Sequence, residues 1–279
     1  MTIKQTLIKA TQKLKTKKIL SPRLDAEVLL AFVLKKDKTF LYTYPNKQLT
    51  SAQLKKFNQL ISKRLKYWPI AYLIGQKEFY KLPFKVNQKV LIPRPETELM
   101  VDEILKLNKK WAVADIGTGS GCIAIALAKN GFNKVYATDI SNSILNLAKQ
   151  NAKLNKVFGK IKFLKGNLFQ PIQNLKIDIA AANLPYLSQK IYKIHIKMFP
   201  TLKHEPKTAL VAPLEGLYYF QQLFEQISNA KHKPKYIFLE IDPDQPEKIK
   251  RLIKNYFKPK SIQIKKDLCG KNRLVIVRL

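Results

Sequence analysis

The stretch "ADIGTGSGCIAIALA", residues 114–128, decides the fold class of this chain. It begins as an apolar strand, continues as a glycine-rich loop, and from Cys122 onward has the composition of a buried helix. Gly117, Gly119 and Gly121 allow a sharp turn and close approach of the backbone to a ligand. Cys122 stands where the dinucleotide fingerprint G-x-G-x-x-G needs its last glycine, so the pattern is D-x-G-x-G-x-G, led by Asp115. The alternative interpretation is a glycine turn with only a structural role.

Strand and helix patterns alternate on both sides of this stretch. Apolar runs predict seven strands, at residues 111–116, 134–139, 160–164, 177–182, 235–241, 261–265 and 274–278. Helical patterns fall at residues 122–129, 143–154, 217–228 and 245–257. This alternation predicts an α/β fold with a doubly wound, mostly parallel seven-stranded sheet. No helix separates the last two strands, so we expect an antiparallel hairpin around Gly270.

The first 75 or so residues have a different organisation and predict a small all-α domain. Apolar residues keep helical spacing, and no glycine precedes Gly75. Ser21 before Pro22 predicts a helix N-cap, and Thr50 with Gln53 has the spacing of a capping box. We therefore expect a helical domain at residues 1–77, a β-hairpin linker at 78–93, and an α/β domain at 94–279 that begins with a helix over residues 97–107.

Composition excludes several classes of protein. Hydrophobic residues make up 46% of the 279 residues, as in a globular protein with a core. No apolar run approaches the roughly 20 residues that span a bilayer, and the amino terminus lacks a secretory apolar segment. Cys122 and Cys269 are the only cysteines, which favours a reducing compartment. The three histidines lie too far apart in the sequence to suggest a metal site. We expect a cytoplasmic protein with no metal.

The net charge of +33 arises from 52 basic and 19 acidic residues. One interpretation is nucleic-acid or ribosome binding through phosphate contacts. The other is a compositional bias toward lysine. Lysines are spread along the whole chain and arginine, which suits bidentate phosphate contacts, is scarce, so we favour bias. Nucleic acid is not required, although a basic surface permits contact with RNA.

Two further strand ends carry candidate ligand residues. Asp139 closes the strand that follows the glycine loop and can accept hydrogen bonds from both ribose hydroxyls of an adenosine. Ser141 is expected to cap the next helix. "LKGNLFQ" resembles the segment in which methyltransferases often have an acid that accepts from the adenine amino group; by this resemblance Asn167 can accept that bond and Leu168 can pack on the adenine face. Asn167 as a plain turn residue is the alternative.

The fourth predicted strand ends in "NLPY", residues 183–186. This segment resembles motif IV of enzymes that methylate nitrogen attached to a planar group, a reaction that needs acceptors for two N–H bonds and alignment with the methyl donor. Asn183 offers a side-chain oxygen and Leu184 a main-chain carbonyl. Pro185 restricts Leu184 to extended geometry, and Tyr186 provides a wall for a planar group. Because Leu184 acts through its backbone, we expect its side chain to be replaceable by alanine or proline.

Several segments together resemble one family. The glycine loop resembles motif I of the class I S-adenosylmethionine-dependent methyltransferases, and "NLPY" resembles their motif IV. In family order, "SPRLDAEVLL", "PIAYLIGQKEFY", "LIPRPETE", "HEPKTAL" and "DLCGKNRLVIVRL" resemble segments of the peptide chain release factor glutamine N5-methyltransferases. The resemblance covers most of the chain, and "LIPRPETE" is its most specific segment.

The resemblance implies a helical domain that recognises class I peptide chain release factors and a Rossmann-like domain that binds S-adenosyl-L-methionine. The methyl acceptor is then the side-chain amide of the glutamine in a Gly-Gly-Gln loop. The implied catalytic residues are Asn183, Leu184, Pro185 and Tyr186. The implied cofactor-binding residues are Asp115, Gly117, Thr118, Gly119, Ser120, Gly121, Asp139, Ile140, Asn167, Leu168 and Asn183.

The sequence departs from the family pattern at three positions. Leu184 replaces a usual proline, Asn167 replaces a usual acid, and Asp242 stands where glycine is common. The form N-L-P-Y also resembles rRNA adenine N6-dimethyltransferases, although those enzymes carry their extra domain after the catalytic core. The alternatives are therefore methylation of a nucleic-acid base or of a ribosomal-protein glutamine, and a non-catalytic RNA-binding module.

Overall fold

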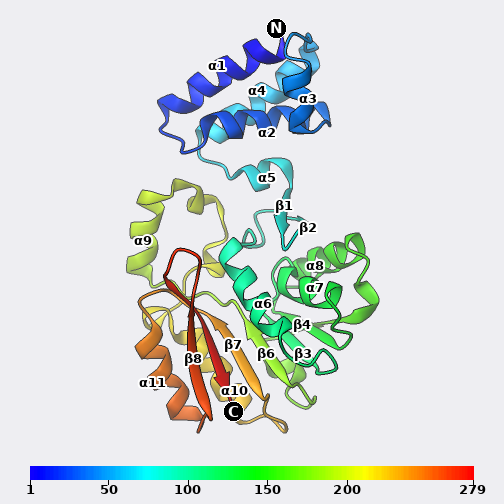
Figure 1. Ribbon diagram of the computed structural model, residues 1–279. Helices are drawn as coiled ribbons and strands as arrows, with labels where there is room; N and C mark the ends of the chain where they lie inside the picture. The colour runs from blue at the N-terminus through cyan, green and yellow to red at the C-terminus, as the bar shows by residue number, and fades with distance from the viewer. The chain divides into compact units, whose positions relative to one another are not determined.

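The computed structural model describes residues 1–279 and divides them into two compact units. The first unit contains Met1–Gln76 together with Phe199–His204, and the second contains Lys77–Met198 together with Glu205–Leu279 (Figure 1). No helix is long and apolar enough to cross a membrane.

The first unit is helical. Its α-helices are α1 (Ile3–Thr16), α2 (Pro22–Leu34), α3 (Lys38–Thr43), α4 (Ser51–Leu65) and α5 (Ile70–Ile74). They enclose their own apolar core, which includes Leu14, Leu30 and Phe57. A buried ion pair crosses this core, since Arg64 of α4 donates to Asp25 of α2 at 2.6 Å. The 3₁₀ turn η4 (Pro200–His204) joins this unit because His204 lies 2.8 Å from the Lys66 carbonyl oxygen.

All three predicted caps stand at helix N-caps, but only one of them makes side-chain capping bonds. The capping box of Thr50 and Gln53 forms, with both reciprocal bonds present. Ser21 is the N-cap of α2 and Pro22 its first residue, as predicted, but the Ser21 hydroxyl donates to the Asp25 carboxylate at 2.9 Å and makes no cap bond. Ser141 is likewise the N-cap of α8, but its hydroxyl forms a hydrogen bond with the Ser143 hydroxyl instead of a cap bond. In both cases a nearby side chain competes with the backbone for the serine hydroxyl.

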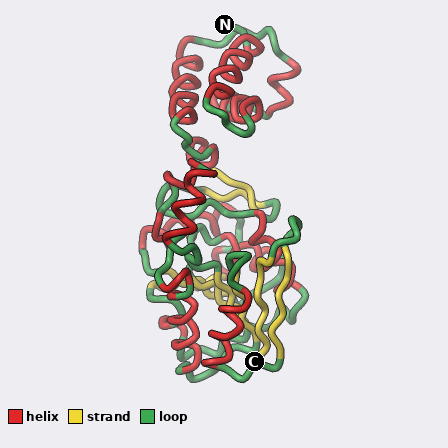
Figure 2. Tube along the Cα trace, turned by 90° about the vertical axis from the view of Figure 1, so that its left-hand side faces the viewer, coloured by secondary structure: helices red, strands yellow, loops and turns green.

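The second unit is built on a seven-stranded sheet of order β5-β4-β3-β6-β7-β9-β8. Its strands are β3 (Val113–Ile116), β4 (Val135–Asp139), β5 (Ile161–Lys165), β6 (Ile179–Ala182), β7 (Tyr236–Glu240), β8 (Ser261–Lys266) and β9 (Asn272–Arg278). The first five are parallel, and β9 runs antiparallel to both β7 and β8. The predicted doubly wound sheet and its closing hairpin are confirmed; the hairpin stands out near the C-terminus in Figure 2.

Helices cover both faces of this sheet (Figure 1). They are α6 (Glu98–Leu105), α7 (Cys122–Lys129), α8 (Asn142–Leu154), α9 (Gln189–Met198), α10 (Tyr218–Ser228) and α11 (Pro246–Tyr256). One face packs on α6 and α7 in a first core cluster, and the other packs on α10 and α11 in a second. Successive side chains of a strand point to opposite faces of the sheet, and so Val113 belongs to the first cluster and Ala114 to the second. The sheet is buried on both sides, as parallel sheets require.

A two-stranded hairpin precedes the sheet, with β1 (Gln76–Phe79) and β2 (Leu82–Lys85). The turn η1 (Pro95–Thr97) then leads into α6, so this helix is shorter than the predicted 97–107. Helix α9 was not predicted, and short 3₁₀ turns fill the remaining connections, at Phe158–Lys160, Gln170–Ile172, Lys207–Ala209 and Leu214–Gly216.

Candidate active site

The candidate site lies at the edge of the sheet where parallel strands end. In strand order, this edge presents Asn167 after β5, Asp139 at the end of β4, Gly117 after β3, Asn183 after β6 and Glu240 at the end of β7. Connections from β3 and β6 run to opposite sides of the sheet, so the point between these two strands is a topological switch point. Open α/β sheets bind ligands in the crevice at such a point.

Asp115 fixes the glycine loop through hydrogen bonds on the interior side of the loop. Its buried carboxylate accepts from the Thr118 hydroxyl at 2.6 Å and from the Ala124 N–H at 3.1 Å. Burial raises the pKa of Asp115 to about 6, against the opposing effect of these two bonds. Asp115 therefore joins the strand, the loop and the first turn of α7, and it faces the protein interior. Thr118 and Ser120 are buried too, so the loop presents mainly backbone to the outside.

Gly117 is the point at which the loop meets the "NLPY" segment. It has a φ of +71°, and a Cβ at this position would lie 3.0 Å from Cδ2 of Leu184. Any side chain here is therefore both strained and obstructed. Glycine at this position lets β3 and β6 bring the loop and Leu184 into contact.

Asp139 lies beside the loop and is tied to it. One carboxylate oxygen accepts from the Gly119 N–H at 3.2 Å and the other from the Ser141 N–H at 3.0 Å. An ionised carboxylate has about four acceptor positions, so acceptor capacity remains for a ligand. The next residue, Ile140, is 68% exposed, so an accessible apolar side chain lies next to a buried acid. An exposed apolar wall next to an acid suits a nucleoside, which has an apolar base face and ribose hydroxyl donors.

Asn167 and Leu168 follow β5 on the far side of Asp139. Asn167 is exposed and its backbone carbonyl closes a turn by accepting from Gln170 N–H at 3.1 Å. Leu168 is mostly buried, with a positive φ of 50°, and its carbonyl accepts from the Thr138 hydroxyl at 2.9 Å. The Asn167 side chain thus stays available at the edge, while Leu168 contributes to the second core cluster as well.

Asn183 is oriented by Thr97, which was not among the predicted site residues. Its amide nitrogen donates to the Thr97 hydroxyl at 3.0 Å, and Thr97 donates to a buried Glu240 carboxylate at 2.6 Å. The Tyr186 hydroxyl donates to the other oxygen of Glu240 at 3.1 Å. Thr97 lies in "LIPRPETE" and Glu240 ends β7, so the signal available in sequence was an acid at a strand's carboxyl end.

Leu184 differs from the sequence expectation. Its side chain is only 3% exposed and belongs to the second core cluster, so we now expect Leu184→Ala to lower stability even where the carbonyl keeps its role. The backbone at this point is also fixed. Gln245 donates to the Tyr186 carbonyl at 3.0 Å, and a Cβ on Gly216 would lie 1.9 Å from that same oxygen. No protein group donates to the Leu184 carbonyl or to Oδ1 of Asn183, which leaves two acceptors at the site.

A second part of "LIPRPETE" is held by the buried Glu205. This carboxylate pairs with Arg94 at 2.6 Å and accepts from the Ile92 N–H at 3.2 Å. Glu205 belongs to "HEPKTAL", so two segments of the family resemblance meet here. In this contact Arg94 and Glu205 hold the two loops together.

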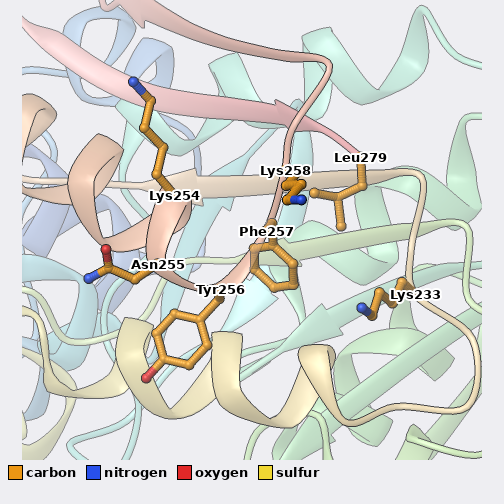
Figure 3. Close-up of a pocket in the computed structure, with 7 residues that line it drawn as sticks. All are labelled: Lys233, Lys254, Asn255, Tyr256, Phe257, Lys258 and Leu279. Atoms are coloured by element: carbon orange, nitrogen blue, oxygen red, sulfur yellow. The ribbon is translucent and has the colours of Figure 1, made fainter.

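A cavity of about 440 Å³ elsewhere on this unit is not part of the site (Figure 3). Its lining includes Lys233, Phe257 and Leu279. Lys233 precedes β7, and Leu279 follows β9, which runs antiparallel to β7. The cavity therefore opens at the amino-terminal edge of the parallel strands, opposite the glycine loop. No cluster of histidine, cysteine or carboxylate side chains suited to a metal ion occurs.

Solved structures place the fold among the methyltransferases. The catalytic domain of hMettl16 in complex with MAT2A 3'UTR hairpin 1 superposes with a TM-score of 0.57 at 15% identity, covering 89% of this chain and 90% of that one. A methyltransferase from Pyrococcus furiosus gives a TM-score of 0.53 at 17% identity, covering 82% of this chain and 98% of that one. With the glycine loop and "NLPY" at one sheet edge, the chain is an enzyme of the class I methyltransferase fold.

Sequence comparisons identify the family within this class. Residues 5–75 match the PrmC N-terminal domain, and residues 96–214 match the ribosomal protein L11 methyltransferase (PrmA) family. The release factor glutamine methyltransferase of Coxiella burnetii is 38% identical over 92% of each chain. That of Dictyoglomus turgidum is 35% identical over 99% of this chain and 98% of the other. The chain belongs to the release factor glutamine methyltransferase family.

Proposed function

We propose that this enzyme transfers a methyl group from S-adenosyl-L-methionine to the side-chain amide nitrogen of the glutamine in the Gly-Gly-Gln loop of peptide chain release factors. The observation that carries the proposal is the pair of unused acceptors, Oδ1 of Asn183 and the Leu184 carbonyl, beside the glycine loop. A primary amide has two N–H bonds, and two acceptors match them. Family membership supplies the substrate class.

The residues present fit the cofactor. Asp139 retains acceptor capacity for ribose hydroxyls, and Ile140 offers an exposed apolar face for adenine. Asn167 offers an uncharged acceptor for the adenine amino group, and Gly117 lets the ligand approach the backbone. When bound, S-adenosyl-L-methionine supplies a methyl group on a positively charged sulfur.

The chain's own contribution to the reaction is alignment. Asn183 and Leu184 hold the two N–H bonds of the target amide, so that its nitrogen lone pair points along the line of transfer. Pro185 keeps Leu184 extended, which directs its carbonyl outward. Tyr186 flanks the planar amide with its ring. Bound S-adenosyl-L-methionine would supply the methyl group and keep the electron pair of the broken carbon–sulfur bond, and the amide nitrogen held by Asn183 and Leu184 would release one proton to water.

Competition between substrates tests the proposal. The enzyme is incubated with cofactor labelled in its methyl group, and with an equimolar mixture of release factor, ribosomal proteins and ribosomal RNA. We expect the label in the release factor. Label in RNA or in a ribosomal protein, with none in the release factor, overturns the proposal in favour of an alternative substrate.

A further inference from the structure

The amide of Asn183 is one end of a buried hydrogen-bonded chain that reaches three other parts of the unit. Its nitrogen donates to Thr97, which lies 86 residues away in the sequence, and Thr97 donates to Glu240, another 143 residues away. Thr97 is 1% exposed and Glu240 is 2% exposed. Tyr186 donates to the same carboxylate. The Glu240 carboxylate is therefore bonded directly to Tyr186 and, through Thr97, to Asn183.

The donor and the acceptor in each of these hydrogen bonds follow from the number of protons and lone pairs on each group. A hydroxyl has one proton and two lone pairs, and an ionised carboxylate accepts only. The 2.6 Å separation of Thr97 Oγ1 and Glu240 Oε2 is that of a charge-assisted bond, so the Thr97 proton lies in this bond. Thr97 can then only accept from Asn183. The Asn183 amide must turn its nitrogen to Thr97 and its oxygen away from it.

The charge state of Glu240 has competing determinants. Burial raises the pKa of Glu240, whereas bonds from Thr97 and Tyr186 and the positive charge of Arg273 favour ionisation. Glu96, on η1, opposes ionisation as well. The three favourable partners come from η1, from the "NLPY" segment and from β9, so the carboxylate is surrounded by groups that support its acceptor role.

We propose that Thr97 and Glu240 are positioning residues that fix the orientation of the Asn183 amide, so that its oxygen accepts from the methyl-accepting nitrogen. An amide that is free to flip presents its NH2 group half of the time, and an NH2 group repels the N–H bonds of the substrate. The Glu240 carboxylate removes this ambiguity. The same carboxylate accepts from the Tyr186 hydroxyl, so Glu240 positions both the Asn183 amide and the Tyr186 ring. The inference rests on the proposed function, because it gives Asn183 the role described there.

Isosteric substitutions separate this role from a purely structural one. Thr97→Val removes the hydroxyl at constant volume, and Thr97→Ser keeps it. Glu240→Gln keeps the shape but adds a donor, which lets Thr97 donate to Asn183 and reverses the amide. We expect Thr97→Val and Glu240→Gln to lower kcat about ten- to a hundredfold, with little change in the KM for release factor or in cofactor affinity. Thr97→Ser should regain most of the lost kcat.

The matched control is Glu103→Gln, the same chemical change on α6 in an ion pair with Lys106, where the Glu103 side chain is 14% exposed. It should retain wild-type kcat. Thermal melting of every variant separates lost turnover from lost fold. Wild-type kcat in folded Thr97→Val protein, or a Thr97→Ser variant that stays as slow as Thr97→Val, overturns the positioning role while the proposed function stands.

A second readout does not depend on methyl transfer. The side-chain NH2 resonances of Asn183, assigned through their loss in Asn183→Asp, report the bond to Thr97. They should shift strongly in Thr97→Val and Glu240→Gln and little in Thr97→Ser. Unshifted resonances in Thr97→Val contradict the assigned orientation. If wild-type protein fails to methylate release factor and these shifts still occur, the proposed function fails and the orientation of Asn183 is retained.

Discussion

At the scale of single residues, Leu184 combines a main-chain role with a side-chain role. Its carbonyl is free for a ligand, and its side chain fills space between the second core cluster and Gly117. From sequence only the first role was apparent, because "NLPY" was interpreted by comparison with a motif that has proline at this position. Burial against a glycine that follows a different strand cannot be inferred from local pattern.

Leu184→Ala should lower the free energy of unfolding by about 2–5 kcal/mol, the usual cost of truncating a buried leucine. Turnover per folded molecule should change little, because the carbonyl remains. Urea unfolding measures the first effect, and initial rates below the unfolding transition measure the second. A variant as stable as wild type, or one that is stable but inactive, contradicts this division of roles.

Asp139 is the residue on which cofactor affinity should depend most. Asp139→Ala removes a charged acceptor and should weaken binding of S-adenosyl-L-methionine by roughly 1.5–3 kcal/mol, with any loosening of the loop at Gly119 adding to the loss. Calorimetry gives the dissociation constant. Asp244→Ala, which removes the same charge from an exposed turn, is the control. Equal affinity of Asp139→Ala and Asp244→Ala removes Asp139 from the binding site.

At the scale of elements, Asp115 joins the strand β3, the glycine loop and helix α7, and this junction should be sensitive to pH. The pKa of Asp115 is raised to about 6 from an ordinary value of 3.8. A raised acid pKa means that the folded state binds the proton more tightly than the unfolded state. The contribution to stability is therefore complete below about pH 4 and is lost as the pH rises through about 6.

The corresponding measurement compares wild type with Asp115→Asn, which cannot ionise. Between pH 4 and pH 7, the wild type should lose roughly 3 kcal/mol more stability than the variant, since each pKa unit is worth about 1.4 kcal/mol. Denaturant unfolding at a series of pH values gives the difference. Parallel stability profiles for the two proteins contradict a buried, proton-binding Asp115.

The elements that sequence predicted best are those with strong periodicity and clear ends. Helix α7 begins at Cys122 and ends at Lys129, as predicted, because glycines and an apolar run define both limits. Helix α9, at Gln189–Met198, was missed because its apolar residues alternate with lysines, and only Tyr192 is buried. The chain from Asn183 through Thr97 to Glu240 was also missed, since it joins three distant segments and no local pattern encodes their contact.

At the scale of the whole molecule, the helical unit has its own core and contributes none of the residues that we assign to the cofactor. We propose that it recognises the release factor. Deleting residues 1–75 should leave cofactor affinity unchanged, because the loop and Asp139 belong to the other unit. It should strongly slow methylation of intact release factor. Calorimetry and methyl-transfer rates on one preparation test both statements; full-rate methylation by the truncated protein contradicts the recognition role.

The most direct test of the account is tandem mass spectrometry of a release factor after incubation with the enzyme and S-adenosyl-L-methionine. We predict that the release factor gains one methyl group, on the side-chain amide of the Gly-Gly-Gln glutamine. Folded Asn183→Ala enzyme should add it at least about a hundredfold more slowly, because an oriented polar contact at the reacting centre is lost. A release factor that stays unmodified by wild-type enzyme, a methyl group on another residue, or equal rates for wild type and Asn183→Ala contradicts it.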